Sequence, residues 1–439
     1  MKILCFTSSL KLSLLSMALC GIVACSDSNK KIDTSGLDVS VFLDGKAEQE
    51  LNQLMDKLAN TENIENAIVF IDVPKHNFRW YHTFGIGDAS TGQQVQKGDN
   101  FRTASIGKML TATRIMQLVE LGLISLDQPI DEIFTDNDMP LDWTLSELSV
   151  VNGKAVGHQI TVRQLLNHHS GVADYLFGAP SSGVSLPEAI VLDVVGALPT
   201  GISKNQWNAD SLLSYYFQTD MYKMPYGMPG EEFNYTDTNY LLLGKIIEKV
   251  TATSLANNYR EGIYSKADMP GAYLEWYEIN QSALPIDHFV DASSQGLYNI
   301  NFNTSGINTS MDWGGGGIVT NAENLNHFLV ALFKDNKLVS ENTLAEMKSF
   351  KPMGEGKGPT TDDYIIELNY GLGVMERVYK VSNKRNVRLY GHEGYYGTYA
   401  YYEPSTHTTI VLALNQVTAE DHWLGDIIKI LNKAKLFGL

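Results

Sequence analysis

A serine and a lysine stand three positions apart, at Ser105 and Lys108, where the chain is predicted to enter a helix. Residues three apart on a helix are neighbours, so the lysine amine can lie beside the serine hydroxyl. The N-terminus of a helix also favours negative charge that develops there. A serine with a basic neighbour is a candidate nucleophile. Taken alone, the spacing fits equally well a helix that begins with a polar residue and carries a solvated lysine.

A second polar segment carries Tyr235 and Asp237, directly before residues 239–250, whose apolar spacing predicts an amphipathic helix. Either Asp237 or Thr238 can cap that helix. Tyr235 would then project from the loop, where its phenol can accept a proton if an ammonium such as Lys108 lowers its pKa. A loop tyrosine that only packs against its neighbours is the simpler interpretation of this segment in isolation.

A third segment brings His392, Gly394 and Tyr395 together between two predicted strands. Gly394 allows the backbone to approach a ligand closely. The backbone N–H of Tyr395, together with that of Ser105, can stabilise an oxyanion. We expect His392 to face the same cleft, although a lone histidine is more often a structural residue than a catalyst.

Strand-like segments occur at both ends of the chain, and helical segments lie between them. Helices are predicted at residues 46–58, 106–121, 161–168, 209–217, 239–250 and 423–434, and strands at 67–73, 78–84, 370–379, 387–390, 399–403 and 408–414. This order predicts an α/β (α+β) fold, in which N- and C-terminal segments form one antiparallel sheet flanked by helices. A mainly helical domain from about residues 131–314 would adjoin it, within a catalytic unit of residues 43–439. The active site would lie in the cleft between the two parts.

Composition excludes several classes of function. The chain has 439 residues, of which 44% are hydrophobic, and a net charge of -17. This acidity disfavours binding to nucleic acid. The three cysteines, Cys5, Cys20 and Cys25, precede the expected folded body, which therefore has no disulfide and no cysteine nucleophile. The pair His168 and His169 lacks a matching metal-ligand spacing, so we expect neither a metal nor an organic cofactor.

The N-terminus has the features of an export signal. Lys2 and Lys11 precede an apolar run at residues 12–24, which is too short to span a bilayer but suits the core of a signal peptide. We therefore interpret residues 1–24 as a signal peptide. No other segment of the sequence is long and apolar enough to be a candidate membrane span.

Residues 22–25, Ile-Val-Ala-Cys, resemble the lipobox of bacterial lipoproteins. The resemblance implies cleavage before Cys25 and lipidation of that cysteine, and Cys20 fits less well because Leu19 precedes it. Residues 25–42 are mostly polar and would form a flexible tether. We expect an exported lipoprotein in the periplasm or at the cell surface, anchored to a bacterial membrane. An ordinary secreted protein, cleaved nearby, is the alternative.

Together the three polar segments resemble the serine β-lactamase and penicillin-recognising enzyme superfamily, in the branch of class C β-lactamases, D-alanyl-D-alanine carboxypeptidases and related esterases. The motifs S-x-x-K, Y-x-N and K/H-x-G occur there in this order. Here they match Ser105 to Lys108, Tyr235 to Asp237 and His392 to Gly394. Further resemblance lies in residues 160–172, 314–325 and 370–373.

The resemblance implies roles for these residues. Ser105 would attack a carbonyl and become acylated, while Lys108 and Tyr235 relay its proton. The amides of Ser105 and Tyr395 would hold the oxyanion, and water would then deacylate the enzyme. The resemblance thus implies a serine hydrolase with a small-molecule, peptide or ester substrate, and we expect a monomer.

Two departures from the family motifs narrow the substrate. Asp237 replaces the usual asparagine, so an amide becomes an acceptor-only carboxylate that can pair with Lys108. Glu393 replaces a hydroxyl residue and would repel an anionic substrate if it faced the cleft. Arg388 could restore a carboxylate site, but the sequence leaves its direction open. We predict a D-alanyl-D-alanine carboxypeptidase-like or esterase-like hydrolase; the alternatives are a weak β-lactamase and a non-catalytic penicillin-binding or regulatory module.

Overall fold

The structure is a computed structural model that describes residues 39–60, 64–180, 183–194, 196–278, 284–291, 301–354, 365–382, 384–417 and 422–437. The expected signal peptide, the lipidation site Cys25 and most of the expected tether lie outside these ranges. The chain divides into two units, Met1–Phe42 and Leu43–Leu439. Of the first unit only the start of helix α1 (Val39–Ala59) is described. Among the described helices, none has both the length and the apolar character needed to cross a bilayer.

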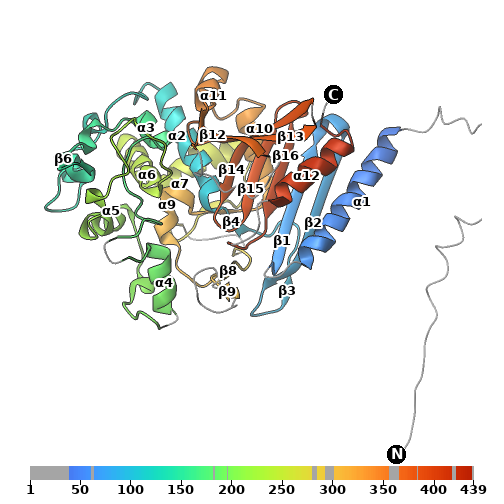
Figure 1. Cartoon of the computed structure of the whole chain (residues 1–439), viewed down its shortest axis with the longest axis horizontal. Helices are drawn as coiled ribbons and strands as arrows, with labels where there is room; N and C mark the ends of the chain where they lie inside the picture. Colours follow the sequence, from blue (N-terminus) through green and yellow to red (C-terminus); the bar gives the residue numbers. More distant parts are fainter. Residues whose placement is uncertain are drawn as a thin grey trace, which may run out of the picture. The chain divides into compact units, whose positions relative to one another are not determined.

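A nine-stranded antiparallel sheet organises the second unit (Figure 1). Its order is β11-β12-β13-β14-β15-β16-β1-β2-β3. The strands are β1 (Asn66–Val73), β2 (Phe78–Asp88), β3 (Gln93–Gln94), β11 (Lys351–Pro352), β12 (Ile365–Tyr370), β13 (Met375–Ser382), β14 (Arg385–Gly394), β15 (Thr398–Glu403) and β16 (Thr408–Ala413). N-terminal β1 pairs with C-terminal β16, where Phe70 lies opposite Val411. The predicted single sheet built from both ends of the chain is therefore confirmed.

Both faces of the central strands are buried, because side chains alternate between them. Val69 and Ile71 join the apolar cluster that contains residues of α1 and α12 (His422–Lys433). Ile68 and Phe70 point the other way, into the cluster that contains α2 (Gly107–Glu120) and α10 (Ala322–Phe333). Helices thus flank the sheet on both faces, as the sequence predicted (Figure 1).

The middle of the chain is mostly helical and contributes several short strands that the sequence did not predict. Its helices are α3 (Val162–Leu166), α4 (Leu186–Val194), α5 (Ala209–Gln218), α6 (Asp237–Thr251), α7 (Leu255–Tyr259), α8 (Ser265–Ala267) and α9 (Trp313–Gly316), and α11 (Glu341–Met347) follows α10. Among the short strands, β10 (Ile318–Thr320) pairs with both β4 (Phe101–Arg102) and β7 (Tyr273–Leu274). Strand β5 (Val150–Val151) pairs with β6 (Lys154–Ala155), and β8 (Phe289–Asp291) pairs with β9 (Asn301–Asn303). Single turns of 3-10 helix lie between many of these elements, among them η2 (Ala104–Ile106).

Two predictions near the C-terminus are wrong in detail. The strand predicted at residues 370–379 is interrupted, since β12 ends at Tyr370 and β13 begins at Met375. Gly373 turns the chain there with φ of 74°, and a Cβ on it would lie 2.2 Å from Cβ of Ala112 on α2. Strand β14 also continues to Gly394, so His392 lies on a strand and not in the following turn.

Candidate active site

Ser105 lies in η2, two residues before α2 begins. Its side chain is partly exposed, whereas Ala104 and Ile106 on either side are buried. Ala104 adopts φ of 47°, a left-handed conformation that costs a residue with a Cβ roughly 1–2 kcal/mol. The preceding residue fixes this turn, because both the N–H and the hydroxyl of Thr103 donate to the Ile318 carbonyl at 2.9 Å. The local backbone therefore presents Ser105 toward solvent at a helix start.

Lys108 is completely buried, and its side-chain nitrogen donates hydrogen bonds to three acceptors. Its Nζ lies 2.9 Å from Ser105 Oγ, 2.5 Å from Asp237 Oδ1 and 3.0 Å from the Gly315 carbonyl oxygen. Three acceptors match the three N–H donors of an ammonium group. Since Ser105 Oγ accepts from Lys108, the serine hydroxyl keeps its own proton to donate elsewhere.

Tyr235 is largely buried and forms a hydrogen bond with Ser105. The centroid of its ring lies 4.9 Å from Lys108 Nζ. Burial, and next the charge of Asp237, raise the pKa of Tyr235 well above its usual value, and the bond to Ser105 opposes them. The expectation that Lys108 would favour a phenolate here is not met, because Asp237 pairs with that ammonium. The raised pKa of Tyr235 favours the neutral phenol over the phenolate.

Asp237 is the first residue of α6, and the cap of this helix is Thr236, whose hydroxyl accepts from the Thr238 N–H at 3.2 Å. Neither residue that the sequence suggested as the cap fills that role. The backbone N–H of Asp237 donates to Asp174 Oδ1 at 3.0 Å. Burial, followed by the charge of Asp237, raises the pKa of the Asp174 carboxyl to about 7. A second buried acid therefore adjoins the Lys108 site.

His392 is buried and belongs to a chain of hydrogen bonds with defined tautomers. His168 Nδ1 accepts from the Thr236 N–H at 3.2 Å, so its Nε2 carries the proton and donates to Tyr370 Oη at 3.2 Å. His392 Nδ1 lies 2.6 Å from the Glu393 carbonyl and must donate to it. The Nε2 of His392 consequently accepts from Tyr370 Oη at 3.0 Å.

This hydrogen-bond chain makes His392 a positioning residue. Burial, and then the nearby Lys108 charge, lower its pKa to about 3, so the ring is neutral. His168 is neutral as well, since burial lowers its pKa well below the usual value. The His168 ring lies 4.3 Å from the Tyr235 ring, between centroids. His392 does not line the pocket beside Ser105 in the described residues, and it supports the wall behind Tyr235.

Glu393 lies on the other face of the sheet from His392. On β15 its partner is Tyr399, in the cluster with α1 and α12, whereas His392 lies opposite Ala400 in the cluster with α2. Glu393 forms an ion pair with Arg377. The repulsion of anionic substrates that Glu393 would have exerted in the cleft is therefore not supported.

Arg388 also pairs away from the site, with Glu376 on β13. Its side chain is 46% exposed, and it does not line the pocket beside Ser105. The direction of Arg388, which the sequence left open, is thus toward solvent and Glu376. It supplies no carboxylate-binding group next to the nucleophile.

A pocket opens beside Ser105 and encloses about 50 Å³. Its lining residues are Ala104, Ser105, Leu176, Phe177, Pro187, Asp237, Met311, Asp312, Gly315, Gly316, Tyr395 and Tyr396. Gly394 allows this arrangement, since a Cβ on it would lie 2.4 Å from the Thr103 carbonyl oxygen. The turn after β14 thereby comes against the Ser105 segment. Ser105 and Tyr395 line one pocket, as two oxyanion amides would require, and that role stays a prediction.

The glycine run at residues 314–317 makes room for the site. It forms α9, and a Cβ on Gly315 would lie 2.4 Å from Asp237 Oδ1. On Gly316 it would lie 2.8 Å from the carbonyl carbon of Ala104. Missing side chains therefore leave room for the Asp237 carboxylate and for the turn before Ser105. The four consecutive glycines were the available signal, whereas nothing in the sequence singled out Asp174 or Asp312.

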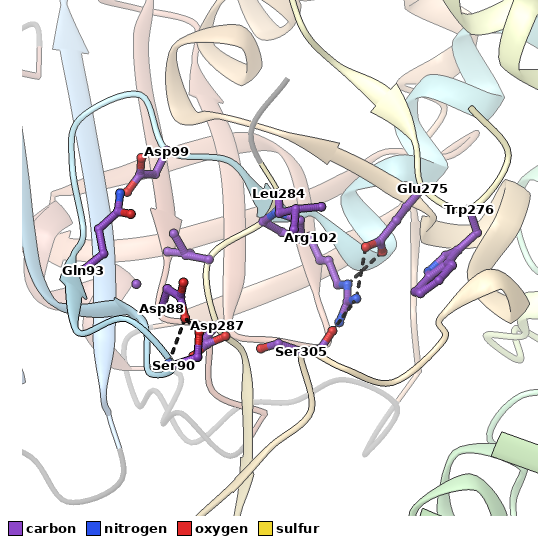
Figure 2. Close-up of a pocket in the computed structure, with 13 residues that line it drawn as sticks. Asp88, Ser90, Gln93, Asp99, Arg102, Glu275, Trp276, Leu284, Asp287 and Ser305 are labelled. Atoms are coloured by element: carbon purple, nitrogen blue, oxygen red, sulfur yellow. Dashed lines mark hydrogen bonds and ion pairs between the residues drawn. The ribbon is translucent and has the colours of Figure 1, made fainter. Parts of the chain in front are cut away.

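Arg102 anchors the strand that leads into Ser105. Its guanidinium forms two bonds to the Glu275 carboxylate, at 2.8 and 3.0 Å, as Figure 2 shows. It also donates to the Ser305 carbonyl at 3.0 Å. These groups border a second cavity of about 530 Å³, whose acidic residues Asp88 and Asp287 also appear in Figure 2.

The sequence is similar to that of curated penicillin-binding proteins. A penicillin-binding protein of Bacillus subtilis (strain 168) is 24% identical over 306 residues, which cover 67% of this chain and 56% of the relative. The chain spans about half the length of the curated relatives it matches.

Solved structures share the fold. A D-stereospecific amidohydrolase from Streptomyces sp. superposes with a TM-score of 0.66 and 22% identity, covering 88% of this chain and 97% of that one. A D-amino acid amidase from Ochrobactrum anthropi gives 0.66 and 20%, covering 90% and 98%. Residues 51–435, most of the chain, match the family described as Beta-lactamase. The chain therefore belongs to the Beta-lactamase family.

Proposed function

We propose that the protein is a serine acyl hydrolase that forms an acyl-enzyme on Ser105 with amide or ester substrates. The observation that carries the proposal is the contact between Lys108 Nζ and Ser105 Oγ, 2.9 Å long, at the edge of a pocket. Tyr235 completes the group from a segment more than a hundred residues away. If Lys108 had only a structural role, neither the partly exposed Ser105 nor the open pocket beside it would be required.

The proton of Ser105 has a route through the buried pair. Lys108 passes one proton to Asp237, which lies 2.5 Å away, and takes the proton of Ser105 as Oγ bonds to the substrate carbonyl carbon. Neutral Tyr235 donates its proton to the leaving group as the amide or ester bond breaks, and it regains a proton from the Lys108–Asp237 pair. Water then attacks the acyl carbonyl and gives one proton back to Ser105.

The charges around the pocket favour an esterase-like or amidase-like reaction over a carboxypeptidase. Among the described residues that line the pocket, none is a lysine or an arginine. Arg377 and Arg388 pair with glutamates and lie outside this lining. A substrate carboxylate beside the scissile bond would therefore lack a cationic partner. The names of the structural neighbours, an amidohydrolase and an amidase, also favour amide substrates.

Labelling with a fluorophosphonate probe, followed by mass spectrometry, tests the nucleophile. We expect one adduct, on Ser105, and hydrolysis of a p-nitrophenyl ester. Ser105→Ala should abolish the adduct and lower kcat/KM by about 10³-fold or more. Ser90→Ala, at the rim of the second cavity, is the matched control and should behave as wild type. Unchanged labelling of Ser105→Ala would show that the nucleophile assignment is wrong.

The same measurements separate the alternatives. A stable penicillin adduct on Ser105 without any ester or amide turnover would favour a binding or regulatory module. Hydrolysis of nitrocefin at the rates of resistance enzymes would instead identify a β-lactamase. An unlabelled serine with no turnover would contradict acyl transfer altogether.

We also propose that the protein is exported and anchored through a lipid on Cys25. This rests on the lipobox resemblance of residues 22–25. Cys25→Ser should move the protein from the membrane fraction to the soluble fraction and abolish incorporation of labelled palmitate. Unchanged fractionation of the variant would favour the ordinary secreted form.

A further inference from the structure

The pocket beside Ser105 has an acidic floor. Asp237 and Asp312 both line it, together with Gly315. Asp237 is 2% exposed, and its Oδ2 has no hydrogen-bond partner among the described residues, although Oδ1 contacts Lys108. A buried carboxylate oxygen without a donor costs free energy that a bound donor would recover. Asp237 thus lines the pocket with one buried carboxylate oxygen that lacks a donor among the described residues.

The charge around the pocket is unbalanced. Three carboxyls, Asp174, Asp237 and Asp312, influence one another around the single ammonium of Lys108. Burial, followed by the charge of Asp237, raises the pKa of Asp312 to about 7. Arg102 is the next cation, and its charge is matched by its ion pair with Glu275. An added positive charge would relieve the repulsion among the carboxylates.

The shape of the pocket suits a small cationic group at the base of a larger apolar one. The pocket volume of about 50 Å³ exceeds the roughly 10–15 Å³ that a single water molecule needs, so a small polar group fits there. The remaining walls are apolar or aromatic, with Phe177 and Tyr395 5.1 Å apart between ring centroids. Aromatic faces stabilise cations and also accept an apolar substituent.

The position of Asp237 relates this group to the scissile bond. Lys108 Nζ contacts both Ser105 Oγ and Asp237 Oδ1, so the two oxygens are at most two hydrogen-bond lengths apart. In an α-aminoacyl substrate, the ammonium nitrogen lies two bonds from the carbonyl carbon that Ser105 attacks. An ammonium on that α-carbon would thus come within reach of the acidic floor.

We propose that Asp237 and Asp312 bind the ammonium group of the substrate, so that the enzyme prefers α-aminoacyl amides or esters with a free amine. This deepens the proposed function and rests on it. A metal ion is a weaker occupant, since the described residues contain no group of three His, Cys, Asp or Glu side chains placed to hold one. Asp312 is partly exposed, and its carboxylate accepts no hydrogen bond in the described part of the chain, so it is the residue to change.

The first test compares phenylalanine p-nitroanilide, as both enantiomers, with its N-acetyl derivative. Wild type should prefer the free amine. Asp312→Asn should lower kcat/KM for the free amine by about tenfold, as expected when a partly solvated charge pair is lost, and change the N-acetyl substrate by less than about twofold. Asp287→Asn removes the same charge at the second cavity (Figure 2) and should change neither value. Equal losses on both substrates, or a wild-type preference for the acetylated one, would overturn the inference.

The second test does not depend on turnover. Ser105→Ala is titrated calorimetrically with phenethylamine and with 2-phenylethanol at about pH 8, where the amine is protonated. The amine should bind at least about tenfold more tightly than the alcohol, and the added Asp312→Asn change should abolish the difference. No preference for the amine refutes the ammonium site, whatever the labelling of Ser105 shows. Amine binding by a protein whose Ser105 cannot be labelled refutes only the proposed hydrolysis.

Discussion

Replacement of Asp237 by asparagine tests whether the buried Lys108 carries a proton in the resting protein. Lys108 is fully buried, and its Nζ lies 2.5 Å from Asp237 Oδ1. Asparagine keeps the shape and an acceptor oxygen but removes the charge. If Lys108 is an ammonium, the variant leaves a buried cation without its counter-charge and loses stability. If Lys108 is a neutral amine, the variant removes one of several repelling carboxylates and gains stability.

The magnitude follows from these opposing effects. Removal of one partner from a buried ion pair costs about 3–5 kcal/mol. The amide oxygen can still accept a bond from Lys108, and repulsion of Asp174 and Asp312 by Asp237 is relieved, which together offset about 1–3 kcal/mol. We therefore expect the free energy of unfolding to fall by about 2 kcal/mol at pH 8.

Urea unfolding at pH 8, followed by circular dichroism, measures this difference as a shift of the midpoint at constant slope. Asp287→Asn is the matched control, because it makes the same charge change at the second cavity and should alter the free energy of unfolding by less than about 0.5 kcal/mol. An unchanged or higher midpoint for Asp237→Asn would refute the ammonium assignment. The proton relay would then begin from a free amine, with no transfer to Asp237.

Three further predictions concern residues around the site. Burial raises the pKa of Asp174 to about 7, so the contribution of this residue to stability is complete below about pH 4 and is lost as the pH rises to about 7. The free energy of unfolding of the wild type should therefore fall by a few kcal/mol over this pH window. In urea titrations, Asp174→Asn should show a smaller fall. Gly394→Ala should lower kcat/KM at least about tenfold and cost about 1–3 kcal/mol of stability, because its Cβ would lie 2.4 Å from the Thr103 carbonyl oxygen. Gly45→Ala is the control: it has open space around it and should leave kcat/KM unchanged. His392→Phe removes the acceptor for the Tyr370 hydroxyl and should lower kcat with little change in KM. Partial recovery of kcat in His392→Gln would confirm a positioning role for His392. A change in KM alone would contradict that role.

The main elements of the fold were predictable because their apolar spacing is regular. Helix α2 was predicted at residues 106–121 and runs over Gly107–Glu120, and β1 and β2 begin within one residue of their predicted starts. The strand predicted at 370–379 failed because Gly371 and Gly373 were treated as strand residues. The close packing of Gly373 on Ala112 is a tertiary constraint, which one segment of sequence does not reveal.

The site was predictable to the extent that its residues belong to motifs. Ser105, Lys108 and Asp237 meet in the structure, and Tyr235 joins them. The side of the sheet on which Glu393 lies was not predicted, because β14 was expected to end before it. Because β14 continues through Glu393, the alternation of side chains along a strand places Glu393 and His392 on opposite faces of the sheet. Asp174 and Asp312 approach the site only through the packing of loops that are distant in sequence, so their effect on its charge had no sequence signal.

The carboxylate at position 237 links the two unusual features of this site. One oxygen accepts a hydrogen bond from Lys108, and the other is buried without a partner in the described residues, on a side chain that lines the pocket. An asparagine in its place could satisfy Lys108 with its carbonyl oxygen, but it would direct an N–H donor into the pocket and favour an acceptor on the substrate. A donor on the substrate, such as an ammonium, is favoured instead by Asp237. The difference between asparagine and aspartate at position 237 is one side-chain atom, nitrogen or oxygen. It changes the counter-charge of Lys108, and it also decides whether a donor or an acceptor on the substrate is favoured beside Ser105.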